Sequence, residues 1–147
     1  MKRTFLLAAL SIFLTSSANA KIVASCGAMT GLSYFLSEGK WSEDGISSGR
    51  FIFDQGEDEK WTVYFQDSTG QLKNTKDDGG VVIPISRGRD NEFMLAVAYP
   101  GHKQFEVYSL VKKPNGERKL FYTMNRNVEI SGNNFAKVSS FTANCEQ

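Results

Sequence analysis

The sequence predicts a small all-β domain, built as an antiparallel barrel of about eight or nine strands. Apolar residues, many of them aromatic or β-branched, alternate with polar residues along most of the chain. Clusters of Gly, Asp and Asn interrupt this alternation about every ten residues, a spacing typical of β-barrels and β-sandwiches. The chain also carries one cysteine near each end of its predicted mature form. A flattened β-sandwich fits the same alternation and remains the alternative architecture.

Residues 1–20 are predicted to be a signal peptide. Lys2 and Arg3 form its basic start, residues 5–14 its apolar core, and Ala18–Ala20 a small-residue cleavage site. This core is too short to span a bilayer, so we expect one soluble, exported β domain over residues 21–147, without a transmembrane segment. That domain holds 15 basic and 16 acidic residues, and this balance provides no basic field for nucleic acid.

The first segment of the domain fits two patterns. Met29, Leu32 and Phe35 lie on one face of a helix, whereas Leu32, Tyr34 and Leu36 alternate as in a strand. Nearby glycines disfavour a helix, so a strand is predicted. Residues 40–49 have the Ser, Gly and Asp content of a loop.

A first hairpin follows. The short apolar run Arg50–Phe53 leads through the acidic turn Asp54–Glu59 into a strand over residues 60–67. The predicted core-facing side chains of this strand are Trp61, Val63 and Phe65.

The remaining strands are separated by turns rich in Gly, Asp, Asn and Pro. Pro84 lacks an amide donor, which places its strand at a sheet edge or a bulge. The almost continuous apolar run Phe93–Tyr99 predicts a well-covered strand, and Pro114–Gly116 is a strong hairpin signal. The expected strands lie at residues 71–75, 81–85, 93–99, 105–111, 120–125 and 137–144, with a loop at 131–134.

A barrel closed by its first and last strands would be lipocalin-like in general architecture. Closure removes exposed sheet edges, and eight strands leave an interior wide enough for side chains or one small ligand. Such closure brings Cys26 and Cys145 together, and an even number of cysteines in an exported chain predicts one disulfide. A second interpretation makes Cys26 the acylated first residue of a lipoprotein. The polar stretch before it and an unpaired Cys145 argue against that interpretation.

No constellation for catalysis, metal or nucleotide binding is evident, so neither an enzyme nor a cofactor is expected. His102 is the only histidine, and its Pro-Gly-His-Lys context predicts an exposed turn. The acidic groups at residues 54–59 and 77–78 lack the spacing of a calcium loop. Gly79–Gly80 lacks the strand-to-helix context of a phosphate loop.

The candidate ligand-binding residues are polar and aromatic and come from the N-terminal segment: Ser33, Tyr34, Trp41, Asp44 and Ser47. Aromatic rings supply apolar area and hydroxyl groups fix a ligand's orientation. Further aromatic side chains expected to border a cavity are Trp61, Tyr64, Tyr99, Tyr108 and Tyr122.

The opening Cys26–Ala28, the stretch Ser33–Phe35, Trp41, the segment 44–51 and the terminal Cys145 resemble a family of small exported bacterial β proteins of proteobacterial type. The resemblance covers most of the mature chain and implies a periplasmic or secreted protein, but it implies no activity. Periplasmic lysozyme inhibitors share the plan of one disulfide in a small β fold, although no stretch here matches their inhibitory loop.

Two functions follow as expectations. The first is a non-enzymatic binding protein of the bacterial cell envelope that holds a small amphipathic ligand in the mouth of the barrel. The alternative is a protein-interaction module, such as a periplasmic inhibitor or an envelope assembly partner. It would act through the basic turns that contain Arg87, Arg89, Lys112 and Lys113.

Overall fold

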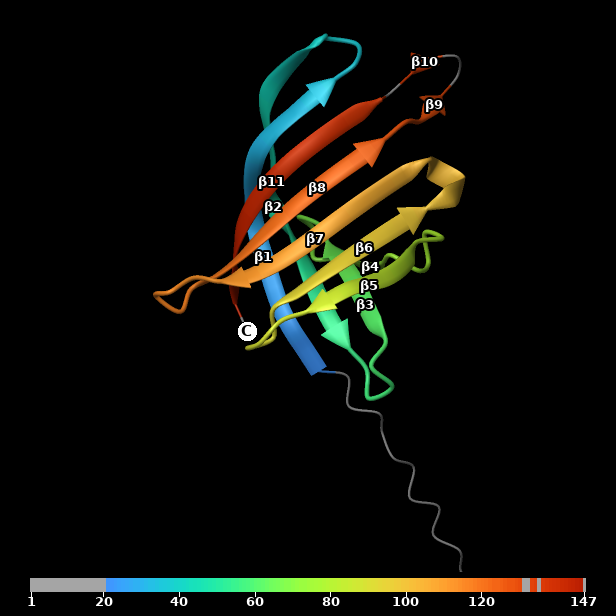
Figure 1. Ribbon diagram of the computed structural model, residues 1–147. Coiled ribbons are helices and arrows are strands. Elements are labelled where there is room, and N and C mark those ends of the chain that lie inside the picture. The colour runs from blue at the N-terminus through green and yellow to red at the C-terminus, as the bar shows by residue number, and fades with distance from the viewer. Residues whose placement is uncertain (1–20, 131–132, 135, 147) are drawn as a thin grey trace, which may run out of the picture.

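The computed structural model describes residues 21–130, 133–134 and 136–146 (Figure 1). The predicted signal peptide therefore lies outside the described residues. One sheet holds nine antiparallel strands, in the order β4-β3-β2-β1-β11-β8-β7-β6-β5. Its strands are β1 (Lys21–Phe35), β2 (Lys40–Gln55), β3 (Trp61–Gln66), β4 (Leu72–Asn74), β5 (Val81–Arg87), β6 (Phe93–Tyr99), β7 (Gln104–Lys112), β8 (Arg118–Arg126) and β11 (Lys137–Glu146).

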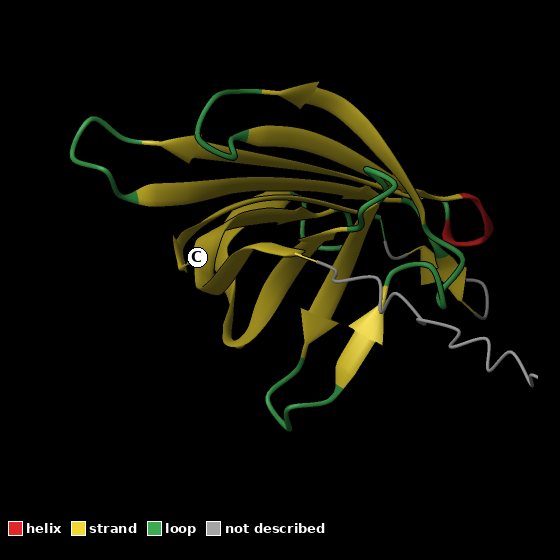
Figure 2. Cartoon of the chain, turned by 90° about the horizontal axis from the view of Figure 1, so that it is seen from below, coloured by secondary structure: helices red, strands yellow, loops and turns green. Residues whose placement is uncertain are grey.

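The sheet curls into a half-barrel, which confirms the predicted all-β, barrel-like fold. Figure 2 shows the curvature from below, with the strands wrapping around a shared interior. The only helical element in the described residues is a short 3-10 turn, η1 (Pro100–His102), and a two-stranded hairpin, β9 (Glu129–Ile130) with β10 (Asn133–Asn134), stands apart from the sheet. Within the described part of the chain, no helix has the length and hydropathy that a membrane span requires.

The first and last strands are neighbours, as predicted. Cys26 lies opposite Cys145 in the β1–β11 pairing, and their sulfurs form a disulfide. Because its sulfur is already bonded, Cys26 has no thiol for acylation, so the lipoprotein interpretation does not fit this structure. Disulfides of this kind persist in oxidising compartments outside the cytosol.

Alternation of side chains divides the sheet into a concave and a convex face. One row of concave residues runs from Leu95 through Tyr108, Tyr122 and Phe141 to Gly31 across five paired strands. Ring contacts fill this face: Phe51 lies 5.1 Å from Tyr108 and 5.3 Å from Tyr122, measured between ring centroids. The hydrophobic core therefore combines aromatic side chains, such as Phe53, Trp61 and Phe93, with aliphatic ones, such as Val63, Leu95 and Leu110.

Side chains close the gap between β3 and β5 at one end of the half-barrel. The guanidinium of Arg87 lies 6.0 Å above the Trp61 ring and 3.6 Å from the Glu59 carboxylate. Trp61 in turn packs on Phe93, with ring centroids 4.7 Å apart. β5 is an edge strand with a register shift between Pro84 and Ser86, as the proline predicts.

The prediction of a loop over residues 40–49 is wrong, because these residues form the first half of β2. They return antiparallel along β1, from Phe35↔Lys40 to Met29↔Ile46. β3 pairs only with residues 50–55, so this half of β2 has a neighbour on one side only. An edge strand of this kind needs little apolar content, and its polar composition therefore resembled a loop.

Candidate functional site

A polar layer lies on the concave face, above the aromatic core. At its centre is Glu106 of β7, which is only 5% exposed. Its carboxylate accepts hydrogen bonds from the hydroxyls of Tyr108 and Tyr122, the latter at 3.0 Å, and from the Gln104 amide at 2.6 Å. Because the acceptor positions of the carboxylate are largely filled, Glu106 serves as an internal link between β7 and β8.

Burial dominates the ionisation of this cluster. It raises the pKa of Glu106 above its usual value, although the hydrogen bonds from Tyr108, Tyr122, Gln104 and Tyr99 act in the opposite direction. Burial together with the Glu106 charge raises the pKa of the Tyr108, Tyr122 and Tyr99 hydroxyls. The tyrosines therefore stay neutral at physiological pH and act as donors.

A second polar chain on the concave face contains two of the predicted ligand residues. The Ser33 hydroxyl donates to Asp44 at 2.6 Å and lies 2.7 Å from the Ser139 hydroxyl. The Lys137 ammonium lies 2.6 Å from the same carboxylate oxygen of Asp44. Burial raises the pKa of Asp44, but the bonds from Lys137, Ser33 and the Gly45 amide outweigh it, so the net pKa is lowered. Ser33 is fully buried, and this chain ties β1, β2 and β11 together.

The other three candidate residues lie on the convex face or near its edge. Tyr34 and Trp41 are opposite each other in the β1–β2 pairing, and their rings meet edge to face with centroids 5.7 Å apart. Trp41 is 54% exposed. Ser47 is exposed at the place where the pairing of β1 and β2 shifts. The five residues thus share one hairpin but belong to two faces.

The additional aromatic residues do not surround a common cavity. Trp61, Tyr108 and Tyr122 are buried in the core, and Tyr99 is half-buried at the rim beside the Glu106 cluster. Tyr64 lies opposite Ile52 and Asn74 in its pairings. Tyr34 lines an apolar surface groove, and the exposed Trp41 ring packs against Tyr34.

An apolar groove adjoins Tyr34 at the end of the barrel where β1 and β8 finish and β11 begins. It has a volume of about 300 Å³. The groove is lined by Tyr34, Leu36, Asn125, Arg126, Asn127, Ala136, Lys137 and Val138. Its lining combines apolar side chains with amides and cations, a composition that suits ligands with an apolar body and a polar head.

Sequence reasoning missed most of the groove. Leu36 is 54% exposed and Val138 is 41% exposed, although alternation gave no sign that either would face solvent. The position of Val138 follows from strand register, because Val138 pairs with Tyr34 and with Asn125. Apolar residues at outward-facing positions of neighbouring strands would have indicated the groove.

The basic turns of the alternative interpretation are mostly neutralised by their neighbours. Arg87 pairs with Glu59 and Gln55, Lys112 lies 2.9 Å from Asp90, and Lys113 lies 2.7 Å from Glu117. His102 is exposed in η1, as its context predicted. Among the described residues, no group of three or more Asp, Glu, His or Cys side chains could hold a metal ion.

Comparisons with known proteins do not identify a family for this chain. No family model matches the chain, and no curated protein or solved structure matches it either.

Proposed function

We propose that this chain is a non-enzymatic, exported binding protein of the bacterial cell envelope, and that it holds a small amphipathic ligand in the groove beside Tyr34. The observation that carries the proposal is the exposed apolar groove at the ends of β1, β8 and β11, beside Tyr34 and Val138 of the convex face. Tyr34 lies in its wall, and the exposed ring of Trp41 stands against Tyr34. Export is supported by the basic, apolar and small-residue pattern of residues 1–20 and by the disulfide.

The border of the groove suits a polar head group. Asn125 and Asn127 bring amides that donate and accept, and Arg126 brings a cation. The Nε of Arg126 is buried and has no hydrogen-bond partner within the described part of the chain. Because this atom is buried, a ligand oxygen would instead bind the terminal nitrogens of the guanidinium, while the apolar body contacts Leu36 and Val138.

Calorimetric titration with dodecanoate, kept below its micelle concentration, tests this proposal. Leu36→Glu replaces an apolar contact by a carboxylate that the alkyl chain of the ligand would have to desolvate, so binding should weaken about tenfold or more. Leu72→Glu is the matched control, because Leu72 is 51% exposed against 54% for Leu36 and does not line the groove. Equal affinity in both variants, or no saturable binding by the native protein, would contradict the proposal.

A protein-interaction module is the second candidate, and one observation favours it. A row of convex residues crosses seven strands in continuous register and carries four exposed apolar side chains, Val81, Phe105, Val138 and Trp41. The polar Asn125 and the half-buried Tyr34 lie between them in the same row. Exposed apolar side chains gathered on one face often mark protein contacts. A photo-crosslinking residue at Phe105 should give a defined product in the cell envelope and one at Leu72 should not. Identical patterns at the two positions would speak against a partner on this row.

A further inference from the structure

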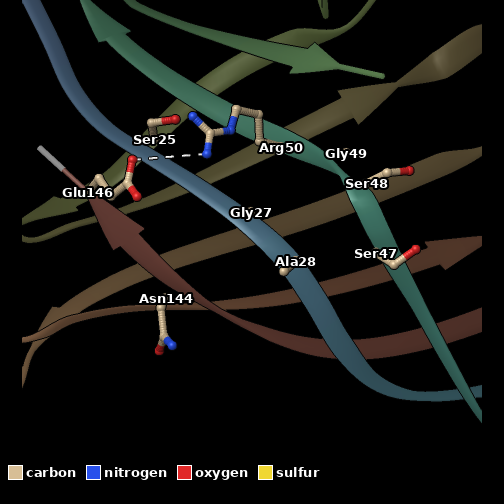
Figure 3. A pocket seen from close by; sticks show the side chains of 9 residues that line it. All are labelled: Ser25, Gly27, Ala28, Ser47, Ser48, Gly49, Arg50, Asn144 and Glu146. Carbon is tan, nitrogen blue, oxygen red and sulfur yellow. Dashed lines mark ion pairs between the residues drawn. The ribbon is translucent and has the colours of Figure 1, made fainter. Parts of the chain in front are cut away.

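A polar pocket of about 360 Å³ opens on the convex face, away from the apolar groove. Figure 3 shows it between β1, β2 and the end of β11. It is lined by Ser25, Gly27, Ala28, Ser47, Ser48, Gly49, Arg50, Asn144 and Glu146. The lining contains hydroxyls, an amide, glycine backbone, one guanidinium and one carboxylate, and it contains no aromatic ring.

Irregular strand pairing creates this pocket. Gly27 pairs with Arg50 and Met29 pairs with Ile46, so the single residue Ala28 faces a bulge of three residues, 47–49, on β2. Ala28 has a positive φ of 52°, which is uncommon outside glycine. The pairing of β1 with β11 shifts in the same place. Bulges on both sides of one strand spread the sheet and leave backbone groups outside the regular ladder.

Two polar groups at one end of the pocket lack a good partner. The Ser25 hydroxyl is buried and makes no hydrogen bond to the described residues. The Arg50 guanidinium has only a long contact, 4.0 Å, to the Glu146 carboxylate, whose side chain is 79% exposed. Ser25 and Glu146 are opposite each other in the β1–β11 pairing, so all three side chains converge there (Figure 3).

The charges near this pocket favour an anion. Arg50 is the cation in the lining, and Lys119 lies beside Asn144 in the β11–β8 pairing, on the same face. Glu146 is the one acidic residue in the lining. Within the lining Arg50 and Glu146 cancel, so the additional cation comes from Lys119, which pairs with Asn144 but does not line the pocket. A guanidinium binds planar or tetrahedral oxygen groups through two parallel hydrogen bonds.

We propose that this pocket binds the oxyanion group of a small ligand, a phosphate or a carboxylate. Arg50 binds the anionic oxygens, Ser25 donates its hydroxyl hydrogen to one of them, and Glu146 moves away into solvent as the anion enters. Ser47, Ser48 and Asn144 surround the rest of the ligand. This site is separate from the groove beside Tyr34, and binding here depends on different residues.

NMR titration of the full mature chain with inorganic phosphate, and separately with acetate, tests the proposal. Saturable shifts should be confined to the amides of residues 27–28 and 47–50, and the anion that gives them identifies the preferred group. Arg50→Gln should weaken binding about tenfold or more, because a hydrogen bond to a charged group is lost. Arg89→Gln, at an exposed arginine outside the pocket, should bind like the native protein.

Two further variants separate binding from folding. Glu146→Gln removes the competing carboxylate and should tighten anion binding, an outcome that general damage to the sheet would not produce. Ser25→Ala should weaken binding while leaving the melting temperature unchanged or higher, because it deletes a buried hydroxyl that has no partner. The proposal is overturned if neither anion gives saturable shifts, or if Arg50→Gln and Arg89→Gln bind equally well.

Discussion

The hydroxyl of Tyr122 on β8 donates a hydrogen bond to the carboxylate of Glu106 on β7, across 3.0 Å of the barrel interior. Both side chains are almost completely buried. The bond is one of several that bring donors to the same carboxylate, so a single acidic group organises the polar layer above the aromatic core. Glu106 therefore stabilises the fold by accepting the hydrogen bonds that its buried neighbours donate.

Replacing Glu106 by Leu should destabilise the domain strongly. The hydroxyls of Tyr108 and Tyr122 and the amide of Gln104 would lose their acceptor inside the barrel. Each buried donor left unsatisfied costs about 1 to 3 kcal/mol, so we expect a loss of at least about 2 kcal/mol in the free energy of unfolding. Urea denaturation measures it. Glu106→Gln keeps an acceptor oxygen and should lose clearly less, and equal losses in the two variants would contradict the hydrogen-bond argument.

Stability should depend on pH in two opposite ways. The pKa of Glu106 is raised in the folded state, so its contribution is complete below the unfolded pKa of about 4.3 and is lost as pH rises through the folded pKa. The pKa of Asp44 is lowered, so its contribution is present above about 3.9 and is lost as pH falls through the folded pKa.

Urea denaturation at a series of pH values separates the two contributions. Glu106→Gln should flatten the decline on the neutral side, and Asp44→Asn should flatten the decline on the acid side. If Glu106→Gln instead changed only the acid limb, the raised pKa of Glu106 would be incorrect.

Removing the disulfide should lower stability without changing the strand order. Cys26 and Cys145 are separated by 119 residues, and a cross-link that closes a loop of this size contributes up to about 4 to 5 kcal/mol through the unfolded state. The double variant Cys26→Ser with Cys145→Ser should unfold at a lower urea concentration while retaining its β-type circular dichroism. Unchanged stability would show that the bond does not constrain the unfolded chain.

Gly31 should not tolerate even a methyl group. A Cβ at this position would lie 2.0 Å from the Ser140 carbonyl oxygen and 2.8 Å from the Phe141 Cα, both in the neighbouring strand. Gly31→Ala must displace β11, which we expect to cost about 1 to 3 kcal/mol. Gly101→Ala is the matched control, because a Cβ there would meet nothing within 4 Å and the φ of Gly101 is not positive. Comparable melting temperatures for both variants would contradict the close β1–β11 packing.

Much of the strand layout was predictable from the sequence. The turn after Phe53, the hairpin at Pro114–Gly116 and the edge position of Pro84 carry local signals, and the structure confirms each of them. The pairing of the first and last strands followed from the two cysteines. These features depend on turn chemistry and on side-chain alternation, which short stretches of sequence contain.

The first half of β2 and the surface sites were not predictable in the same way. Residues 40–49 became a strand because β1 offers a partner, and their own composition did not indicate it. Ser33 and Tyr34 are adjacent in sequence but face opposite sides, so the five candidate residues divided between two faces. The groove and the polar pocket arise from register between strands distant in sequence and from bulges, and single-sequence patterns do not specify these.

The most direct test of ligand binding beside Tyr34 is the NMR signal of the two tryptophan indoles during titration with dodecanoate. Trp41 is 54% exposed and packs against Tyr34, whereas Trp61 is 7% exposed and lies in the core. Binding in the groove should shift the Trp41 indole in a saturable manner, leave the Trp61 indole in place, and disappear in Leu36→Glu but not in Leu72→Glu. A Trp41 signal that stays fixed, or that shifts equally in both variants, would contradict the proposed function.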